Sequence, residues 1–292
     1  MNTGREVAMR VFASEYRHST RKHSEGGDRA PSYVISPMGA RINRLFIAGT
    51  LTEISNSGSE DDPVWKAKVV DGTGVFFISA GKYQPQAAAA LSKIEPPQFV
   101  AVVGKSRIYS PDDTTNYLSV RPEAVRVIDR KERDMWVLQA ARDLKRRMEA
   151  FQELLRMESP SSKELMSLGY PEHIAEGVVL AYDYYGEPDI VTYRALLVRA
   201  LRSLLPGYEE DLGDLAIDYD EDDAEAVDED MQKTFLEMVD EFDTDDRGAE
   251  VAKLYETGKK RGFSREDMEN MLHYLLETGA VYEPQLGRIK RT

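Results

Sequence analysis

The sequence has no cysteine and only four histidines among its 292 residues. The lack of cysteine excludes disulfides, thiolate metal sites and thiol nucleophiles, and it fits a reducing, cytoplasmic location. The histidines show no HExxH spacing, so they do not predict a zinc site. We therefore expect neither a metal nor a cofactor.

Other absences narrow the class of protein. No apolar run approaches the roughly 18 residues of a membrane span, and the first ten residues lack the apolar core of a secretory signal, so we expect no membrane partner. Neither a GxxxxGK[ST] phosphate loop nor a GxSxG nucleophile motif occurs. The acidic pairs Asp61-Asp62 and Asp112-Asp113 lie in predicted turns. These observations indicate a protein that is not an enzyme.

The sequence has an excess of acidic charge, with a net value of −14, and this charge is unevenly distributed. Residues 1–130 carry 17 Lys and Arg against 14 Asp and Glu, and residues 131–205 carry 11 against 12. Residues 206–292 carry 10 against 26. The mildly basic first part is compatible with binding a polyanion, whereas the acidic last part opposes it.

The first 130 residues predict an arm and a barrel. Residues 1–44 are polar and turn-rich, which favours a partly ordered N-terminal surface arm or edge extension. Residues 45–130 predict three strands, a short helix and two further strands. These elements are expected at 45–54, 64–70, 75–79, 84–94 (the helix), 99–109 and 116–128. A lone helix between the third and fourth strands is typical of a five-stranded OB-fold barrel.

The remainder predicts three more regions and an α+β multidomain class. Residues 131–205 form a helical region in which a long helix, 129–158, precedes three shorter ones. Residues 206–230 contain 13 acidic residues and no Lys or Arg, which predicts an extended acidic linker. An alternative is that the charge of this segment mimics that of a nucleic acid, so that the segment occupies the groove of the barrel when no nucleic acid is bound. Residues 231–292 predict three helices and a hairpin, the pattern of a winged-helix domain.

Several motifs in the first domain resemble the archaeal replication-protein-A-associated proteins. They are Arg5–Ala13, Ala30–Tyr33, Gly39–Arg44, Leu51–Glu53, Asp71–Gly74 and Ala80–Tyr83. The C-terminal part is similar to the winged helices of the middle subunit of eukaryotic replication protein A and of minichromosome maintenance helicases. The resemblance implies an accessory subunit that binds single-stranded DNA, associates with the large subunit of replication protein A and is cytoplasmic and nucleoid-associated.

An OB barrel binds single strands through a basic groove and through aromatic side chains that stack on bases. Lys66 and Lys68 alternate with Ala67 and Val69, so they face the groove if the latter are core. Further candidates for phosphate contact are Lys82, Lys105, Arg107 and Arg121. The resemblance places stacking aromatics at Tyr83 and Tyr109, and Tyr117 is a further candidate.

The adjacent residues Phe76 and Phe77 point to opposite faces of a strand. Alternation from Val75 predicts that Phe77 is core and that Phe76 is exposed and able to stack.

The third helix of the C-terminal domain is acidic, which argues against binding in a DNA major groove and favours recruitment of replication and repair proteins. A competing hypothesis remains open: the protein is an assembly subunit whose barrel contacts protein and does not itself bind DNA.

Overall fold

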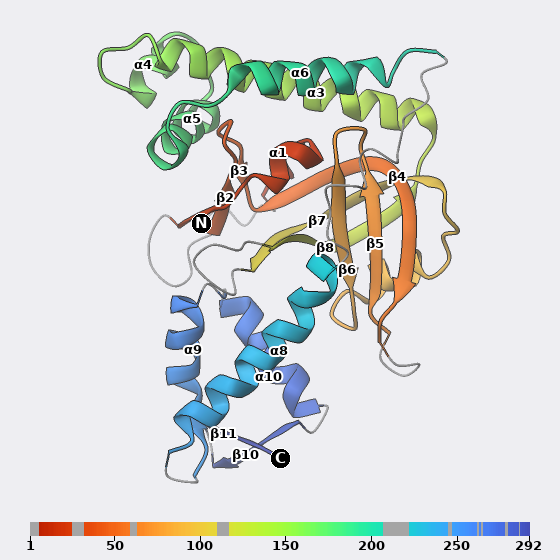
Figure 1. Cartoon of the computed structure of the whole chain (residues 1–292), viewed down its shortest axis with the longest axis vertical. Coiled ribbons are helices and arrows are strands. Elements are labelled where there is room, and N and C mark those ends of the chain that lie inside the picture. Colours follow the sequence, from red (N-terminus) through yellow and green to blue (C-terminus); the bar gives the residue numbers. More distant parts are fainter. Residues whose placement is uncertain are drawn as a thin grey trace. The chain divides into compact units, whose positions relative to one another are not determined.

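The computed structural model describes most of the chain, which divides into two compact units (Figure 1). The first comprises residues 1–107 and 118–219, and the second comprises 108–117 and 220–292. The described residues are 6–24, 32–58, 63–109, 117–206, 222–244, 247–261, 263, 265–277, 280–285 and 287–292. The paired aspartates at 61–62 and 112–113 lie outside them.

The first unit contains a closed five-stranded barrel. Its strands are β4 (Arg44–Asn56), β5 (Trp65–Val70), β6 (Val75–Ala80), β7 (Gln98–Tyr109) and β8 (Tyr117–Val127), with helix α2 (Pro85–Leu91) between β6 and β7. They close in the order β4-β5-β6-β8-β7. The expected OB-like order of strands and helix is confirmed.

Alternating side chains and two glycines explain how these strands close. The inward residues of β7, Val100 and Val102, are both fully buried. A Cβ atom added at Gly49 of β4 would lie 2.3 Å from the carbonyl oxygen of Val70. One added at Gly104 of β7 would lie 2.4 Å from that of Arg121. Only glycine permits these close backbone approaches, which bend the strands around the barrel.

Residues 1–44 were expected to form a surface arm or an edge extension; where they are described they are part of the packed structure, so the surface arm was wrong for them. They form helix α1 (Ala13–Arg17) and a sheet of β1 (Arg21–Ser24), β2 (Ser32–Ile35) and β3 (Arg41–Ile42). Phe12 and Tyr16 are almost completely buried. The Tyr16 hydroxyl lies 2.9 Å from Ser106 Oγ and donates to the carbonyl oxygen of Ser119 at 2.8 Å. The prediction used the average polarity of residues 1–44, which does not reveal single buried side chains such as Phe12 and Tyr16.

The turn Asp71–Gly74 joins β5 to β6 and holds α1 in place. Asp71 Oδ2 accepts from the Ala13 amide at 2.7 Å, and Oδ1 accepts from the amides of Thr73 and Gly74 and from the Thr73 hydroxyl. Burial raises the pKa of Asp71 to about 6, and the four hydrogen bonds act in the opposite direction. The turn is therefore structural.

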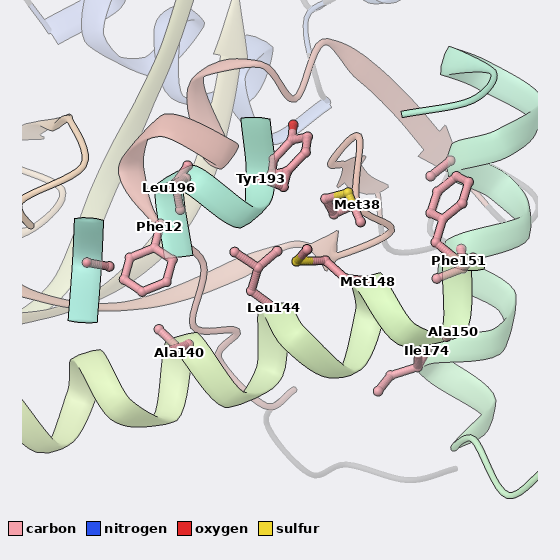
Figure 2. Close-up of a cluster of buried hydrophobic side chains, with 14 of the residues drawn as sticks. Phe12, Met38, Ala140, Leu144, Met148, Ala150, Phe151, Ile174, Tyr193 and Leu196 are labelled. Carbon is pink, nitrogen blue, oxygen red and sulfur yellow. The ribbon is translucent and has the colours of Figure 1, made fainter. Parts of the chain in front are cut away.

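Within residues 128–206, which the structure describes, the barrel is followed by helices α3 (Arg130–Leu154), α4 (Ser162–Ser167), α5 (Glu172–Tyr185) and α6 (Ile190–Arg202). A capping box starts α3, because Asp129 accepts from the Glu132 amide and Glu132 accepts from that of Asp129. The apolar face of α3 meets α5, α6 and the N-terminal segment in one core (Figure 2). In this core Phe12, Leu144, Tyr193 and Leu196 lie close together.

A buried ion pair crosses this core. Arg147 of α3 and Glu15 of α1 are 2% and 0% exposed, and Arg147 Nη2 lies 2.7 Å from Glu15 Oε2. Ser36 donates to Glu15 Oε1 at 2.6 Å. The charged pair thus ties the N-terminal segment to the helix that follows the barrel.

The second unit contains helices and a small sheet. Its elements are α8 (Asp222–Phe242), β9 (Ala249–Glu250), α9 (Val251–Lys260), α10 (Arg265–Glu277), β10 (Val281–Gln285) and β11 (Arg288–Arg291), and the sheet has the order β10-β11-β9. Phe235, Met238 and Leu254 are among its core residues. The extended linker was predicted to reach residue 230, but α8 begins at Asp222. Acidic residues favour the first turns of a helix, where they complement its dipole. Residues 207–221 of that linker lie outside the described part.

Candidate nucleic-acid interface

Lys66 and Lys68 lie on the outer face of β5. Ala67 and Val69 are 4% and 1% exposed and line the barrel interior, so alternation turns both lysines outward. Both lysines are partly exposed. The expected burial of Ala67 and Val69 is confirmed, and the role of the two lysines in binding DNA stays a prediction.

Phe77, and not Phe76, accompanies these lysines. Phe76 is 1% exposed and packs 5.8 Å from the Tyr16 ring, centroid to centroid, whereas Phe77 is partly exposed. The prediction that Phe76 is the exposed aromatic was therefore wrong. The prediction assumed that Val75 belongs to the barrel core, but Val75 is buried against Val70 on the outer face, next to the turn.

The register between β5 and β6 could have identified Phe77 from the sequence. A four-residue turn, 71–74, makes Val70 and Val75 partners, and the ladder then pairs Lys68 with Phe77 and Lys66 with Ser79. Directly paired residues of an antiparallel ladder lie on the same face. The outer face of β5 and β6 thus presents two ammonium groups beside one aromatic ring, and Phe77 packs on Val70 and Val75.

Lys82 and Tyr83 lie just beyond the end of β6. Ala80, the last residue of β6, pairs with Trp65 at the start of β5, so Lys82 and Tyr83 follow at the Lys66 end of the two strands. Tyr83 is 38% exposed, and Lys82 Nζ lies 5.3 Å from the centroid of its ring. Here too a cation lies beside an accessible aromatic ring.

Arg121 belongs to the same side of the barrel. Ile78 of β6 pairs in parallel with Val120 of β8, and Val120 is fully buried. Its neighbour Arg121 therefore points outward. It lies beside Ser79, which pairs with Lys66 on the other side.

Lys105 and Arg107 lie on β7, which pairs with the opposite edge of β4. Lys105 faces Arg44 across that ladder, and Arg44 forms an ion pair with Glu123. The sequence candidates thus divide into a group on β5, β6 and β8 and a separate pair on β7.

Tyr109 and Tyr117 occupy strand ends. Tyr109 is the last residue of β7 and its side chain is outside the described part, whereas Tyr117 is the first residue of β8 and is partly buried. Both belong to the segment 108–117, which is grouped with the second unit. They are not assigned to the face of β5 and β6.

One carboxylate was not anticipated at this face. Glu53 of β4 pairs with Lys68 in the ladder, and its Oε2 lies 2.9 Å from Lys68 Nζ. The side chains of Glu53 and Lys68 are 63% and 27% exposed. The cation nearest to Phe77 is therefore partly neutralised.

Two further classes of site are absent from the described residues. They contain no group of three or more His, Asp or Glu side chains placed to hold a metal ion. No helix within the described ranges has the length and apolar character required to cross a membrane.

No protein-family model and no curated protein matches the chain. Among solved structures, a replication protein A heterotrimer bound to ssDNA is 17% identical, with 49% of this chain and 98% of that chain covered and a TM-score of 0.34. The second single-stranded DNA-binding protein of Mycobacterium smegmatis is 14% identical, with 30% and 86% covered and a TM-score of 0.25. The yeast Stn1 and Ten1 structure is 11% identical, with 43% and 60% covered and a TM-score of 0.28.

Proposed function

We propose that this protein binds single-stranded DNA through the outer face of β5 and β6, defined here by Lys66, Lys68 and Phe77. The observation that carries the proposal is the cross-strand pairing of Lys68 with Phe77, both outside the barrel core. Proteins bind single strands with basic side chains that contact the phosphates and with aromatic side chains that stack on the bases. This face supplies both, and Lys82 with Tyr83 extends it beyond β6.

In this proposal the chain is an accessory subunit of an archaeal replication protein A complex, as the sequence resemblance implies. The helices after the barrel would contact the large subunit. The apolar face of α3 is buried within this chain, so a surface for the large subunit must lie on another helix. Val191, Val198, Leu201 and Leu205 are exposed at spacings of seven, three and four residues on and just after α6, a pattern that packs against another helix.

The second unit recruits replication or repair proteins rather than reading duplex DNA. Its order of helix, strand, two helices and hairpin is typical of a winged helix, which supports the proposal of a winged-helix domain. On α10 the one arginine, Arg265, pairs with Glu269. Of the basic residues on the hairpin, Arg288 pairs with Glu250 and Arg291 with Asp240. These pairs reduce the positive charge available to a DNA backbone.

Fluorescence anisotropy with a labelled oligothymidylate at low salt tests the DNA-binding role. Lys66→Gln/Lys68→Gln should weaken binding and flatten its salt dependence by about 0.7 logarithmic units for each lost phosphate contact. Lys145→Gln/Lys163→Gln makes the same charge change on exposed residues of the helices and should leave binding unchanged. Absence of single-strand affinity, both alone and with the large subunit, would refute the role.

A second candidate function is that of an assembly subunit whose barrel contacts protein. The exposed apolar stripe of α6 favours it, as does the mild net charge of residues 1–130. Alanine at Tyr83 and Tyr109 separates the two hypotheses. If a complex of this chain and the large subunit binds the oligonucleotide equally well with both substitutions, and with both lysines replaced, the barrel is a scaffold.

A further inference from the structure

Strand β4 carries a bulge beside the face of β5 and β6. Leu51 pairs with Val69, but the next pair is Glu53 with Lys68, so Thr52 is the additional residue. Beyond the bulge, Ile54 pairs with Ala67, which is 4% exposed. A bulge of this kind shifts the residues that follow it to the other face of a strand.

The bulge decides where the Glu53 carboxylate lies. In an unbroken ladder Thr52 would pair with Lys68, and Glu53 would pair with Ala67 on the interior side. With the bulge, Ile54 takes that place, and Glu53 lies outside in the same row as Lys68 and Phe77. The row thus reads carboxylate, ammonium and aromatic ring across three strands.

We infer that Glu53 is an internal competitor for the phosphate that Lys68 binds, an inference that rests on the proposed single-strand binding. The Glu53 Oε2 atom lies 2.9 Å from Lys68 Nζ, the distance of a direct ion pair. A phosphate oxygen that contacts Lys68 must replace this carboxylate or share the ammonium with it. Glu53 is 63% exposed and can turn into solvent when that happens.

This competition has a characteristic effect on salt dependence. Salt weakens single-strand binding because each phosphate neutralised by the protein releases bound counterions, with a slope of about −0.7 per contact in a logarithmic plot. If Lys68 exchanges the Glu53 carboxylate for a phosphate, it releases fewer counterions than an unpaired lysine would. Its contribution to the slope is then smaller than that of a full contact. Removal of the Glu53 charge should therefore restore the full contribution of Lys68.

The test is a salt titration of anisotropy with an oligothymidylate of about 16 nucleotides, the upper end of the site sizes of single OB folds. Glu53→Gln should bind about two- to five-fold more tightly than the wild type at low salt, the size of an exposed ion pair. Its logarithmic slope should be steeper by up to about 0.7, so the gain shrinks as salt rises. Glu153→Gln, which removes an exposed carboxylate paired with Arg156 on the helical side, should change neither quantity.

A double-mutant cycle identifies Lys68 as the group on which Glu53 acts. Lys68→Gln should cost more affinity and more slope in the Glu53→Gln background than in the wild type. Equal costs in the two backgrounds, or Glu53→Gln with the affinity and slope of the wild type, would overturn the inference while the single-strand binding of the wild type stands.

Weaker binding by Glu53→Gln would also overturn the inference. If that weakening appears with oligocytidylate but not with oligothymidylate, Glu53 accepts a hydrogen bond from a base instead. If the wild-type chain binds no oligonucleotide, alone or with the large subunit, the proposed function fails and this inference fails with it.

Discussion

Replacing Arg147 with methionine should destabilise the first unit by about 3–5 kcal/mol, the usual cost of leaving one member of a buried ion pair alone. Glu15 is 0% exposed, and after the substitution the hydrogen bond from Ser36 would be the one left to its carboxylate among the described residues. The double variant Glu15→Leu/Arg147→Met removes both charges and should recover much of the loss, because apolar side chains often replace a buried pair at little cost.

Urea unfolding followed by tryptophan fluorescence suits this prediction. The chain has two tryptophans, Trp65 and Trp136, and both belong to the first unit, so the signal does not report the second unit. Urea is uncharged and does not screen the ion pair. Arg156→Met, which removes an exposed partner of Glu153, should cost less than about 1 kcal/mol. A cost below about 1 kcal/mol for Arg147→Met, or additive costs in the double variant, would refute the account of this core.

Two further predictions concern the barrel. Because burial raises the pKa of Asp71 from 3.8 to about 6, the folded state holds its proton over a pH range in which the unfolded state has lost it. The stability advantage of the wild type over Asp71→Asn should therefore fall as pH rises from 4 to 6, by about 3 kcal/mol at most; an advantage that grows with pH in urea titrations would contradict this. Gly49→Ala should destabilise the barrel by about 3 kcal/mol or more, because its Cβ would meet a carbonyl oxygen. Gly81→Ala, whose Cβ would lie 3.7 Å from the nearest side-chain atom, should be neutral or slightly stabilising by the same measurement.

The order of strands in the barrel could be predicted from the sequence because local signals agree there. Alternation marks β5, turn residues separate the strands, and the alanine-rich segment after Pro85 forms the expected helix. The long helix α3 was also predictable, since its buried positions recur at helical spacing. These are short-range patterns, and the residues that form them lie close together in the chain.

Long-range packing could not be predicted in the same way. The N-terminal residues look like a polar arm because residues 1–44 are polar on average, whereas the partners of Phe12 and Tyr16 lie far along the chain. The prediction for Phe76 was wrong because it assumed that Val75 faces the barrel interior. Val75 is instead buried on the outer face, against Val70 and Phe77. The bulge at Thr52 left no signal that alternation alone could detect, so the position of Glu53 was missed.

Photochemical crosslinking tests the central claim most directly. The full chain would be irradiated with an oligonucleotide that carries 5-iodouracil and then digested with trypsin. Cleavage after Lys68 and Lys82 yields a peptide, residues 69–82, that contains both phenylalanines, and its fragmentation distinguishes them. We expect attachment at Phe77, which is lost in Phe77→Leu, and no modification of Phe76. Attachment only at β7 or in the second unit would contradict it.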